Sequence, residues 1–217
     1  NKLDEPEFRE LYNTWLQYGL LVFPGQHLSN DEQVEFARRF GELEFPLAAI
    51  TNVDKDGIVH HDEQEDWVKS IRGNMGWHCD STYMPVQAKG AVFTAHTVPS
   101  SGGETGWADM QAAYDALDDA RQARVARLSA YHSLWYSQAK LGHKPEVGGG
   151  YGFHDLPAPL RPLVKTHPET GKKTLTIGRH AHAIPGVTAE ASDTLRQELV
   201  DFACQAPRVY HHTWTPG

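Results

Sequence analysis

The strand-like segments of this sequence are short, and most follow one another across turns rather than across helices. Apolar and β-branched residues predict strands at residues 20–23, 89–98, 104–108, 163–164 paired with 174–177, and 208–214. Glycine and proline gather between them, as at residues 99–103. This order favours a mainly β fold with flanking helices, a β-sandwich or jelly roll, over alternating βαβ units.

Helical signals occur near the start of the chain and between the strands. Apolar residues at helical spacing predict a first helix that stops at Gly19, and a second that opens with the capping-box pair Ser29 and Glu32. Further helices are predicted at residues 109–117, 118–128 and 188–204. The charged stretch 54–72 and the glycine- and proline-rich stretch 140–162 are predicted to be loops.

Charge and length exclude several classes of protein. The chain has 217 residues, which suits one domain. Its net charge is -8, and we expect neither a nucleic-acid nor an anionic-membrane partner, because both need a basic face. The sequence holds no apolar run of transmembrane length, and Asn1 to Asp4 begin no apolar signal core, so we expect a cytoplasmic protein. Its 2 cysteines predict neither a disulfide framework nor a thiolate metal site.

Residues 77–81, Trp-His-Cys-Asp-Ser, place an imidazole and a carboxylate two positions apart. Alternate side chains of an extended strand leave the same face, so His78 and Asp80 would point together, roughly 6–7 Å apart along the strand. One divalent ion above that face could bind both. Two histidines and one carboxylate on one side of an ion leave positions open for substrate and dioxygen, as in non-haem iron(II) oxygenases.

A His-x-Asp pair is a weak signal by itself, because a chain with 13 histidines is expected to contain about one by chance. Residues 60–63, His-His-Asp-Glu, carry the same spacing. They lie in the charged stretch without apolar neighbours, and we interpret them as a solvated surface turn. Apolar and aromatic residues flank His78 and Asp80 instead, which favours a buried, dry site.

Five blocks along the chain together resemble one protein family. They are residues 74–83, 98–105 with 107–117, 163–173, 178–181 and 211–217. In order and spacing they are similar to the taurine and 2,4-dichlorophenoxyacetate dioxygenases, which depend on iron(II) and 2-oxoglutarate. The match covers nearly the whole chain and is much more specific than the single motif. It implies one dioxygenase domain over residues 1–217, with a double-stranded β-helix (jelly roll, cupin-like) core.

The resemblance assigns roles to individual residues. The histidine and aspartate of the family motif bind iron, which here means His78 and Asp80. The threonine after the paired glycines contacts 2-oxoglutarate, which points to Thr105; the alternative is an ordinary strand residue. The asparagine four positions before the metal histidine lies near cosubstrate and substrate, which suggests Asn74, unless that residue is only a turn former. Ser81 would line the substrate pocket through its backbone.

The resemblance places two further functional residues after the segment that matches residues 214–217. They are the third iron ligand, a histidine, and the arginine that binds the far carboxylate of 2-oxoglutarate. We therefore expect both beyond Gly217, and expect the C-terminal part of the domain to be missing from this chain. His211 and His212 precede that position and alternate on a predicted strand, so we interpret them as structural or surface residues.

The implied reaction uses dioxygen and converts 2-oxoglutarate to succinate and carbon dioxide while a small, anionic substrate is hydroxylated. Residues 180–184, His-Ala-His-Ala-Ile, resemble the branch that cleaves aryloxyalkanoic acids by hydroxylation beside the ether oxygen. His180 or Arg179 could meet the substrate carboxylate, or could instead form a surface or interface ion pair.

Other functions stay open at this point. Taurine, other sulfonates and alkyl sulfates are alternative substrates within the family. A hydrolase or isomerase on the same barrel and a non-catalytic jelly-roll binding protein with a lost iron site are alternatives of another class, because fold does not fix function. Dependence on 2-oxoglutarate separates the enzyme classes. The oligomeric state, including a homo-oligomer, is open as well.

Overall fold

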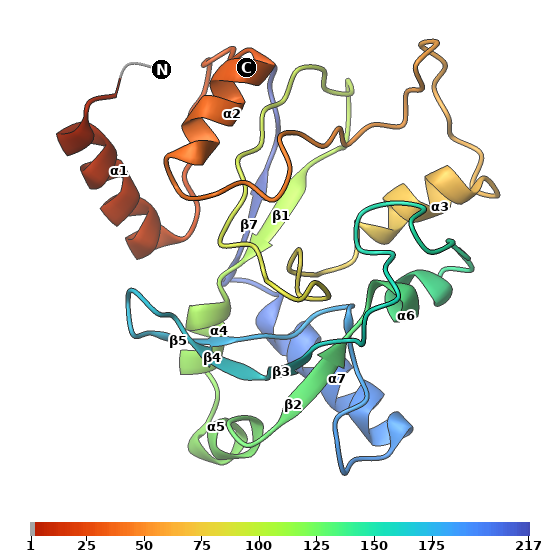
Figure 1. Ribbon diagram of the computed structural model, residues 1–217. Coiled ribbons are helices and arrows are strands. Elements are labelled where there is room, and N and C mark those ends of the chain that lie inside the picture. The colour runs from red at the N-terminus through yellow and green to blue at the C-terminus, as the bar shows by residue number, and fades with distance from the viewer. Residues whose placement is uncertain (1–2) are drawn as a thin grey trace.

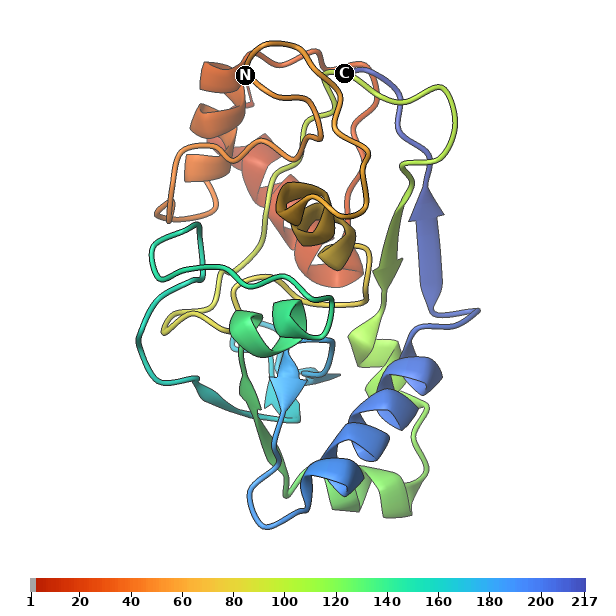
Figure 2. The same ribbon diagram turned by 90° about the vertical axis from the view of Figure 1, so that its right-hand side faces the viewer.

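The computed structural model describes residues 3–217, and Figures 1 and 2 show it from two sides. Residues 1–2, where the expected domain and the segment without a signal core begin, lie outside the described residues. The described helices are α1 (Glu5–Tyr18), α2 (Asn30–Arg38), α3 (Asp66–Gly73), α4 (Met110–Asp115), α5 (Asp119–Val125), α6 (Leu134–Ala139) and α7 (Ala189–Ala203). The described strands are β1 (Thr105–Ala108), β2 (Ser129–His132), β3 (Leu160–Pro162), β4 (Val164–Thr166), β5 (Lys173–Leu175), β6 (Ala181–His182) and β7 (Val209–His212).

The strands form three small antiparallel sheets. β1 pairs with β7, with Thr105 opposite His212, although about a hundred residues separate them in sequence. β2 lies between β3 and β6, and β4 pairs with β5 across the turn at residues 167–172. Both views place α1 and α2 at one end of the β1–β7 pair, and α7 with α4 and α5 at the other end (Figures 1 and 2).

Local signals explain the ends of the helices. α1 begins with a capping box, in which the Asp4 side chain accepts from the Glu7 N–H and the Glu7 side chain accepts from the Asp4 N–H. It ends at Gly19, whose φ of 75° is the left-handed conformation that glycine adopts without steric cost. α2 opens with the same motif from Ser29 and Glu32. The predicted stop of the first helix at Gly19 and the predicted start of the second at Ser29 are both confirmed.

The main hydrophobic core lies between α7, α4 and the strands β2, β4 and β5. Its most deeply buried members include Ala113 of α4, Val125 of α5, Ala130 of β2, Leu163 between β3 and β4, and Ala203 of α7, each at most 1% exposed. Burying a side chain such as Leu163 contributes about 1.5–3 kcal/mol. A second, smaller cluster of Tyr83, Leu134 and Phe153 packs directly after the His-x-Asp motif. The core therefore supports that motif from its C-terminal side.

Several predicted elements differ from the structure. Helices hold more of the described residues than strands do, so a mainly β chain is not what residues 3–217 form, and their strands close no barrel. Residues 89–98 and 20–23 belong to no strand, because no neighbour within residues 3–217 supplies ladder hydrogen bonds. Residues 66–73, predicted as loop, form α3, whose apolar contact is limited to one face around Val68.

The described helices are also too short or too polar to cross a membrane: within residues 3–217 none has the length and apolar character of a membrane span.

Candidate metal centre

His78 and Asp80 converge on one point. The Nε2 atom of His78 lies 3.2 Å from Oδ1 of Asp80. The other ring nitrogen of His78, Nδ1, lies 2.6 Å from the carbonyl oxygen of Gly76, to which it donates its proton. In the protonated ring Nε2 shares its proton with Asp80, and in the neutral ring the bond to Gly76 favours the form whose lone pair is on Nε2, where a metal ion could take the place of that proton. An imidazole lone pair and a carboxylate oxygen therefore face the same small volume.

The backbone that carries this pair is not the predicted sheet strand. Residues 78–79 belong to no helix, strand or turn, and Asp80 begins a turn. Ser81 follows with φ of 59°, a left-handed conformation that is uncommon for a residue other than glycine. Such a residue costs about 1–3 kcal/mol and persists where its surroundings hold it, often at functional sites. A turn, rather than strand alternation, thus brings the two side chains together.

The pair is also more open than the flanking residues predicted. The side chain of His78 is 20% exposed, but that of Asp80 is 60% exposed. Trp77 covers one side and packs against Gly106 of β1, where an added Cβ would lie 2.8 Å from the indole. His78 is therefore half-buried and Asp80 is exposed, so the expectation of a buried, dry site is not met within the described residues.

A proton and a metal ion would compete for this pair. Burial lowers the pKa of His78, but the hydrogen bonds to Asp80 and to the Gly76 carbonyl outweigh it, so the pKa stands above the ordinary value of 6.5. The hydrogen bond from His78 holds the pKa of Asp80 below its ordinary value. A divalent ion can replace that shared proton, because metal ligands must be deprotonated. The 3.2 Å separation suits two neighbouring ligands on one ion, since metal–nitrogen and metal–oxygen bonds are about 2.0–2.2 Å for an ion such as zinc.

Thr105 lies at the start of β1, beside the motif. Its Oγ1 accepts a hydrogen bond of 2.8 Å from the indole Nε1 of Trp214, near the end of the paired segment. Because the indole can only donate, the Thr105 hydroxyl keeps its own proton to donate to another group. Asn74 is exposed just after α3, and its backbone N–H donates to Ile71. Within the described residues its side chain makes no hydrogen bond, so both amide groups are available.

Ser81 is buried and joins two loops that are distant in sequence. Its Oγ lies 2.9 Å from the hydroxyl of Tyr151, which is 70 residues away. The Tyr151 hydroxyl in turn donates to Oε2 of Glu44 at 2.7 Å. This chain of contacts draws the loops around residues 44 and 151 over the turn at Asp80. Nothing in the sequence near Tyr151 or Glu44 signals this role.

His180 packs against the pair, with its ring centroid 5.4 Å from that of His78 and 4.9 Å from that of Tyr83. The Oγ of Ser137 donates to the carbonyl of Leu134 at 2.9 Å, so it accepts at 2.8 Å from Nδ1 of His180. Burial above all, and then the neighbouring His78, lower the pKa of His180 to about 3. The ring is neutral, and its Nε2 carries no proton to donate to a substrate carboxylate.

Arg179 lies between two backbone carbonyls. Its Nη1 donates to Gly73 and its Nη2 donates to Ser137 at 3.0 Å. Within residues 3–217 it forms no ion pair, so the surface ion pair weighed from the sequence is absent there. A substrate contact by Arg179 stays a prediction, although the structure already occupies both terminal nitrogens.

A second arginine, which the sequence did not single out, holds the other end of the motif. Arg161, on β3, donates from Nε to the carbonyl of Thr82 and from Nη2 to the carbonyl of Met84, both at 2.5 Å. Planar guanidinium groups suit two parallel bonds of this kind. Arg161 from β3 therefore binds backbone carbonyls after Asp80, and Arg179 from the β5–β6 connection binds a backbone carbonyl before His78.

Other histidines do not complete a ligand set. Within the described part of the chain no group of three His, Cys, Asp or Glu residues could hold a metal ion. His211 is exposed and lies edge-on to Trp77 at 6.2 Å. His60, from the decoy segment, lies between Asp54 at 3.1 Å and Glu65 at 2.6 Å, so it is a paired loop residue rather than a fully solvated one.

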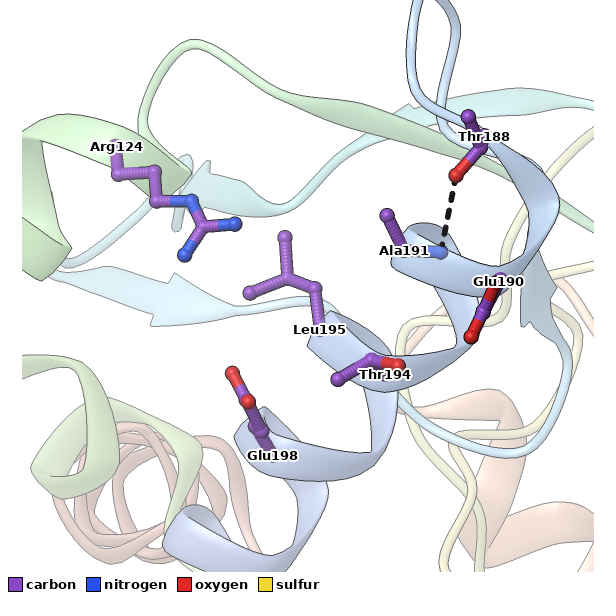
Figure 3. Close-up of a pocket in the computed structure, with 7 residues that line it drawn as sticks. All are labelled: Arg124, Thr188, Glu190, Ala191, Thr194, Leu195 and Glu198. Carbon is purple, nitrogen blue, oxygen red and sulfur yellow. Dashed lines mark hydrogen bonds between the residues drawn. The ribbon is translucent and has the colours of Figure 1, made fainter.

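A hollow of about 340 Å³ lies elsewhere, on α7 and α5 (Figure 3). The close-up shows Arg124 facing Leu195 and Glu198 across it, with Thr188 and Glu190 at the N-terminal end of α7. Its polar lining is the start of an ordinary capped helix, where Thr188 accepts from the Ala191 N–H. None of the residues singled out by sequence lines this hollow.

Comparisons with known proteins show the family to which the chain belongs. The model of the family "Taurine catabolism dioxygenase TauD, TfdA family" matches residues 1–217. The (S)-phenoxypropionate/alpha-ketoglutarate-dioxygenase of Sphingobium herbicidovorans is 60% identical over 220 residues, which is 99% of this chain and 77% of that protein. The protein of the same description from Delftia acidovorans is 56% identical over 225 residues, with the same shares covered. The crystal structure of AAD-2 in complex with Mn(II) and N-oxalylglycine superposes with a TM-score of 0.91 at 33% identity, covering 100% of this chain and 79% of that one.

Proposed function

Because the chain belongs to the TauD/TfdA family of dioxygenases, we propose that it cleaves an aryloxyalkanoic acid of the phenoxypropionate class. It is an oxidoreductase, an iron(II)- and 2-oxoglutarate-dependent dioxygenase, and its products from 2-oxoglutarate are succinate and carbon dioxide. The choice of substrate rests on the phenoxypropionate-acting relatives at 60% and 56% identity.

The single observation that carries the proposed site is the convergence of His78 Nε2 and Asp80 Oδ1 at 3.2 Å. An imidazole and a carboxylate are two of the three ligands that leave open positions on a non-haem iron(II) centre. The donor set therefore fits iron(II), and His78 and Asp80 are the residues that would hold it. When bound, the iron activates dioxygen with electrons from 2-oxoglutarate, which loses carbon dioxide and becomes succinate.

The remaining ligands are proposed to lie outside the described residues. We expect the third ligand, a histidine, and the arginine for the far carboxylate of 2-oxoglutarate beyond Gly217. This proposal rests on the resemblance, and the chain spans 77% of the length of the two relatives. The jelly-roll closure of the domain, which three separate sheets do not make within residues 3–217, belongs to the same expectation.

The protein's own groups would bind and orient the small molecules. Thr105 has a hydroxyl proton free to donate to a carboxylate of 2-oxoglutarate, and Asn74 offers an exposed amide beside the motif. The backbone of Ser81 directly follows Asp80 and would line the substrate pocket. His180 would form part of its wall, as a neutral ring without charge for the carboxylate.

Chemistry at the substrate then needs one hydroxylation. One oxygen atom from dioxygen is inserted into the C–H bond of the carbon between the ether oxygen and the carboxylate, so that the hydrogen ends on the new hydroxyl. The product is a hemiketal, whose C–O bond to the aryl oxygen breaks while the new hydroxyl loses its proton. A phenol and a 2-oxo acid result. The chain contributes placement of that C–H bond, since proximity and orientation are what a protein adds to cofactor chemistry.

Succinate and phenol release by the full-length protein tests the substrate class. The expected result is equal release of both from a phenoxypropionate enantiomer, strictly dependent on iron(II) and 2-oxoglutarate. Taurine and an alkyl sulfate serve as substrates of the alternative classes. Succinate release stimulated by taurine or the sulfate but not by any aryloxyalkanoate would reject the proposal. Full activity without 2-oxoglutarate would point to hydrolase or isomerase chemistry instead.

A further inference from the structure

Residues 178–180 lie directly against the backbone of the proposed iron-binding segment. Gly178 is buried, and a Cβ added to it would lie 3.1 Å from both the Cα of His78 and the carbonyl oxygen of Trp77. The next N–H, that of Arg179, donates to the same Trp77 carbonyl at 2.9 Å. A side chain at this position would have to push these backbone atoms away by a few tenths of an ångström. The connection between β5 and β6 therefore packs against the backbone of Trp77 and His78 and holds it in place.

The side chain of Arg179 extends this support to the turn that precedes His78. Its Nη1 donates to the carbonyl of Gly73, the last residue of α3, and its Nη2 donates to Ser137 of α6 at 3.0 Å. The Cδ of Arg179 would lie 3.3 Å from a Cβ on Gly76. The guanidinium thus joins α3 to α6 and lies against the turn at residues 73–76.

This turn controls the orientation of the His78 ring. The Gly73 carbonyl that Arg179 binds also accepts the N–H of Gly76 at 3.4 Å. The carbonyl of Gly76 then accepts from Nδ1 of His78 at 2.6 Å. Moving the Gly73 carbonyl therefore moves the acceptor that keeps the proton on Nδ1 and the lone pair on Nε2. Such partners of metal-ligating histidines set the ring tautomer and orientation.

The geometry points to Arg179 as a positioning residue. Its guanidinium holds the turn at residues 73–76, so that the Gly76 carbonyl accepts from Nδ1 of His78 and leaves Nε2 to bind the metal. This role replaces the substrate contact suggested by the sequence. This positioning role rests on the proposed function only in taking His78 as an iron ligand, because the hydrogen bonds that support the role lie within the chain itself.

The experiment uses the full-length protein and two variants, Arg179→Ala and Arg179→Lys, and its first measurement needs no metal. The ¹⁵N chemical shifts of the His78 ring report its tautomer, at a pH high enough to keep the ring neutral. The wild type is expected to carry its proton on Nδ1. Arg179→Ala is expected to populate the Nε2–H form, and Arg179→Lys is expected to lie between, because one ammonium cannot reach both carbonyls.

The second measurement is the affinity for iron(II) under anaerobic conditions. Loss of a group that orients a metal-ligating histidine typically weakens binding by about 10–100-fold, and we expect a loss in this range for Arg179→Ala. The KM for the organic substrate is expected to change little. Arg196→Ala is the matched control, because Arg196 lines the same groove of about 210 Å³ but contacts neither carbonyl.

Chemical rescue separates a positioning role from a general loss of structure. The groove is lined by Arg72, Ser137, Lys140 and Arg179, among others, and gives methylguanidinium access to the space that Arg179→Ala vacates. Methylguanidinium is expected to restore both the Nδ1–H tautomer and iron affinity, and methylammonium is not.

Two results would overturn the inference. One is an unchanged His78 tautomer and iron affinity in Arg179→Ala together with a raised substrate KM, which would make Arg179 a substrate contact. The other is a loss of iron affinity that methylguanidinium does not restore and that Arg179→Lys shares in full. Failure of the proposed function looks different: the wild type itself would then bind iron(II) without involving His78, while the tautomer measurement still reports on Arg179.

Discussion

At the scale of single residues, the hydrogen bonds already made by a side chain decide what it can still do. His180 has given its one ring proton to Ser137, so it can accept but cannot donate. Arg179 has committed both terminal nitrogens to carbonyls. Thr105 receives a proton from Trp214 and keeps its own. Of these three residues, Thr105 is therefore the one best prepared to bind an anionic cosubstrate.

Replacing the Thr105 hydroxyl should weaken 2-oxoglutarate binding. For Thr105→Val we expect the KM for 2-oxoglutarate to rise about tenfold or more, because a hydrogen bond to a charged group contributes about 1.5–3 kcal/mol. Steady-state kinetics with varied 2-oxoglutarate provides the measurement. Thr105→Ser should recover most of the affinity, since it restores the hydroxyl that also accepts from Trp214. Thr166→Val, on exposed β4, is the control. An equal KM in the valine and serine variants would exclude the hydroxyl from cosubstrate binding.

The sequence predicts some of the residues of the site but not all of them. The His78–Asp80 spacing and the family-like blocks single out the pair, and the structure brings its two atoms to 3.2 Å. Arg161 and Tyr151 could not be found this way, because they reach the motif from about 70 to 80 residues away through backbone carbonyls and a hydroxyl. Contacts to backbone atoms leave no residue pattern at either end.

At the scale of elements, the sequence predicts helices whose signals lie within one or two turns, but not elements that depend on contacts with distant segments. The capping boxes of α1 and α2 and the apolar face of α7 predict those helices because each signal lies within one or two turns. α3 is not predicted, although Trp67, Val68 and Ile71 recur at helical spacing, because Glu65 makes no capping hydrogen bond and the surrounding stretch is charged. The apolar residues 89–98 read as a strand, but a strand needs a partner that residues 3–217 do not provide.

The loop before α3 contains a titratable cluster of its own. His60 lies 3.1 Å from Asp54 and 2.6 Å from Glu65, and its ring packs on Trp67 at 4.8 Å. The hydrogen bond to Asp54 first, and then that to Glu65, raise the pKa of His60 above 6.5. A raised folded-state pKa means that the stabilisation is fully present below 6.5 and is lost as the pH rises through the folded-state value.

We therefore expect residues 54–65 to loosen in the alkaline range. Hydrogen exchange of this segment, corrected for the intrinsic effect of pH, should be slower below pH 6.5 than well above it. His60→Gln should remove the difference, because an amide does not titrate. His61→Gln, at the exposed neighbouring position, should leave it in place. A pH dependence that survives in His60→Gln would assign the effect to other groups.

At the scale of the whole molecule, the elements that form the hydrophobic core differ from the side chains proposed to bind the metal and the small molecules. The large core lies between α7, α4 and the small sheets, and Trp77, the residue before His78, packs against it, whereas the carboxylate of Asp80 is exposed. The β1–β7 pair places Thr105 and Trp214 beside Trp77, and the loops of Glu44 and Tyr151 converge on Ser81 from another side. The chain's last residue returns to Gln26 and Ala95 through backbone hydrogen bonds, at the end of the molecule where α2 lies (Figures 1 and 2). Oligomeric state and cellular location stay predictions.

The proposed activity requires one metal ion that His78 and Asp80 bind and that keeps coordination positions for 2-oxoglutarate. Anaerobic titration of iron(II) into the full-length protein with saturating 2-oxoglutarate tests this most directly, followed by visible absorption. We predict a weak metal-to-ligand absorption band that reaches its limit at one iron per chain. The band should vanish in both His78→Ala and Asp80→Ala and persist in His60→Gln. A band of full intensity in either of the first two variants would contradict the account.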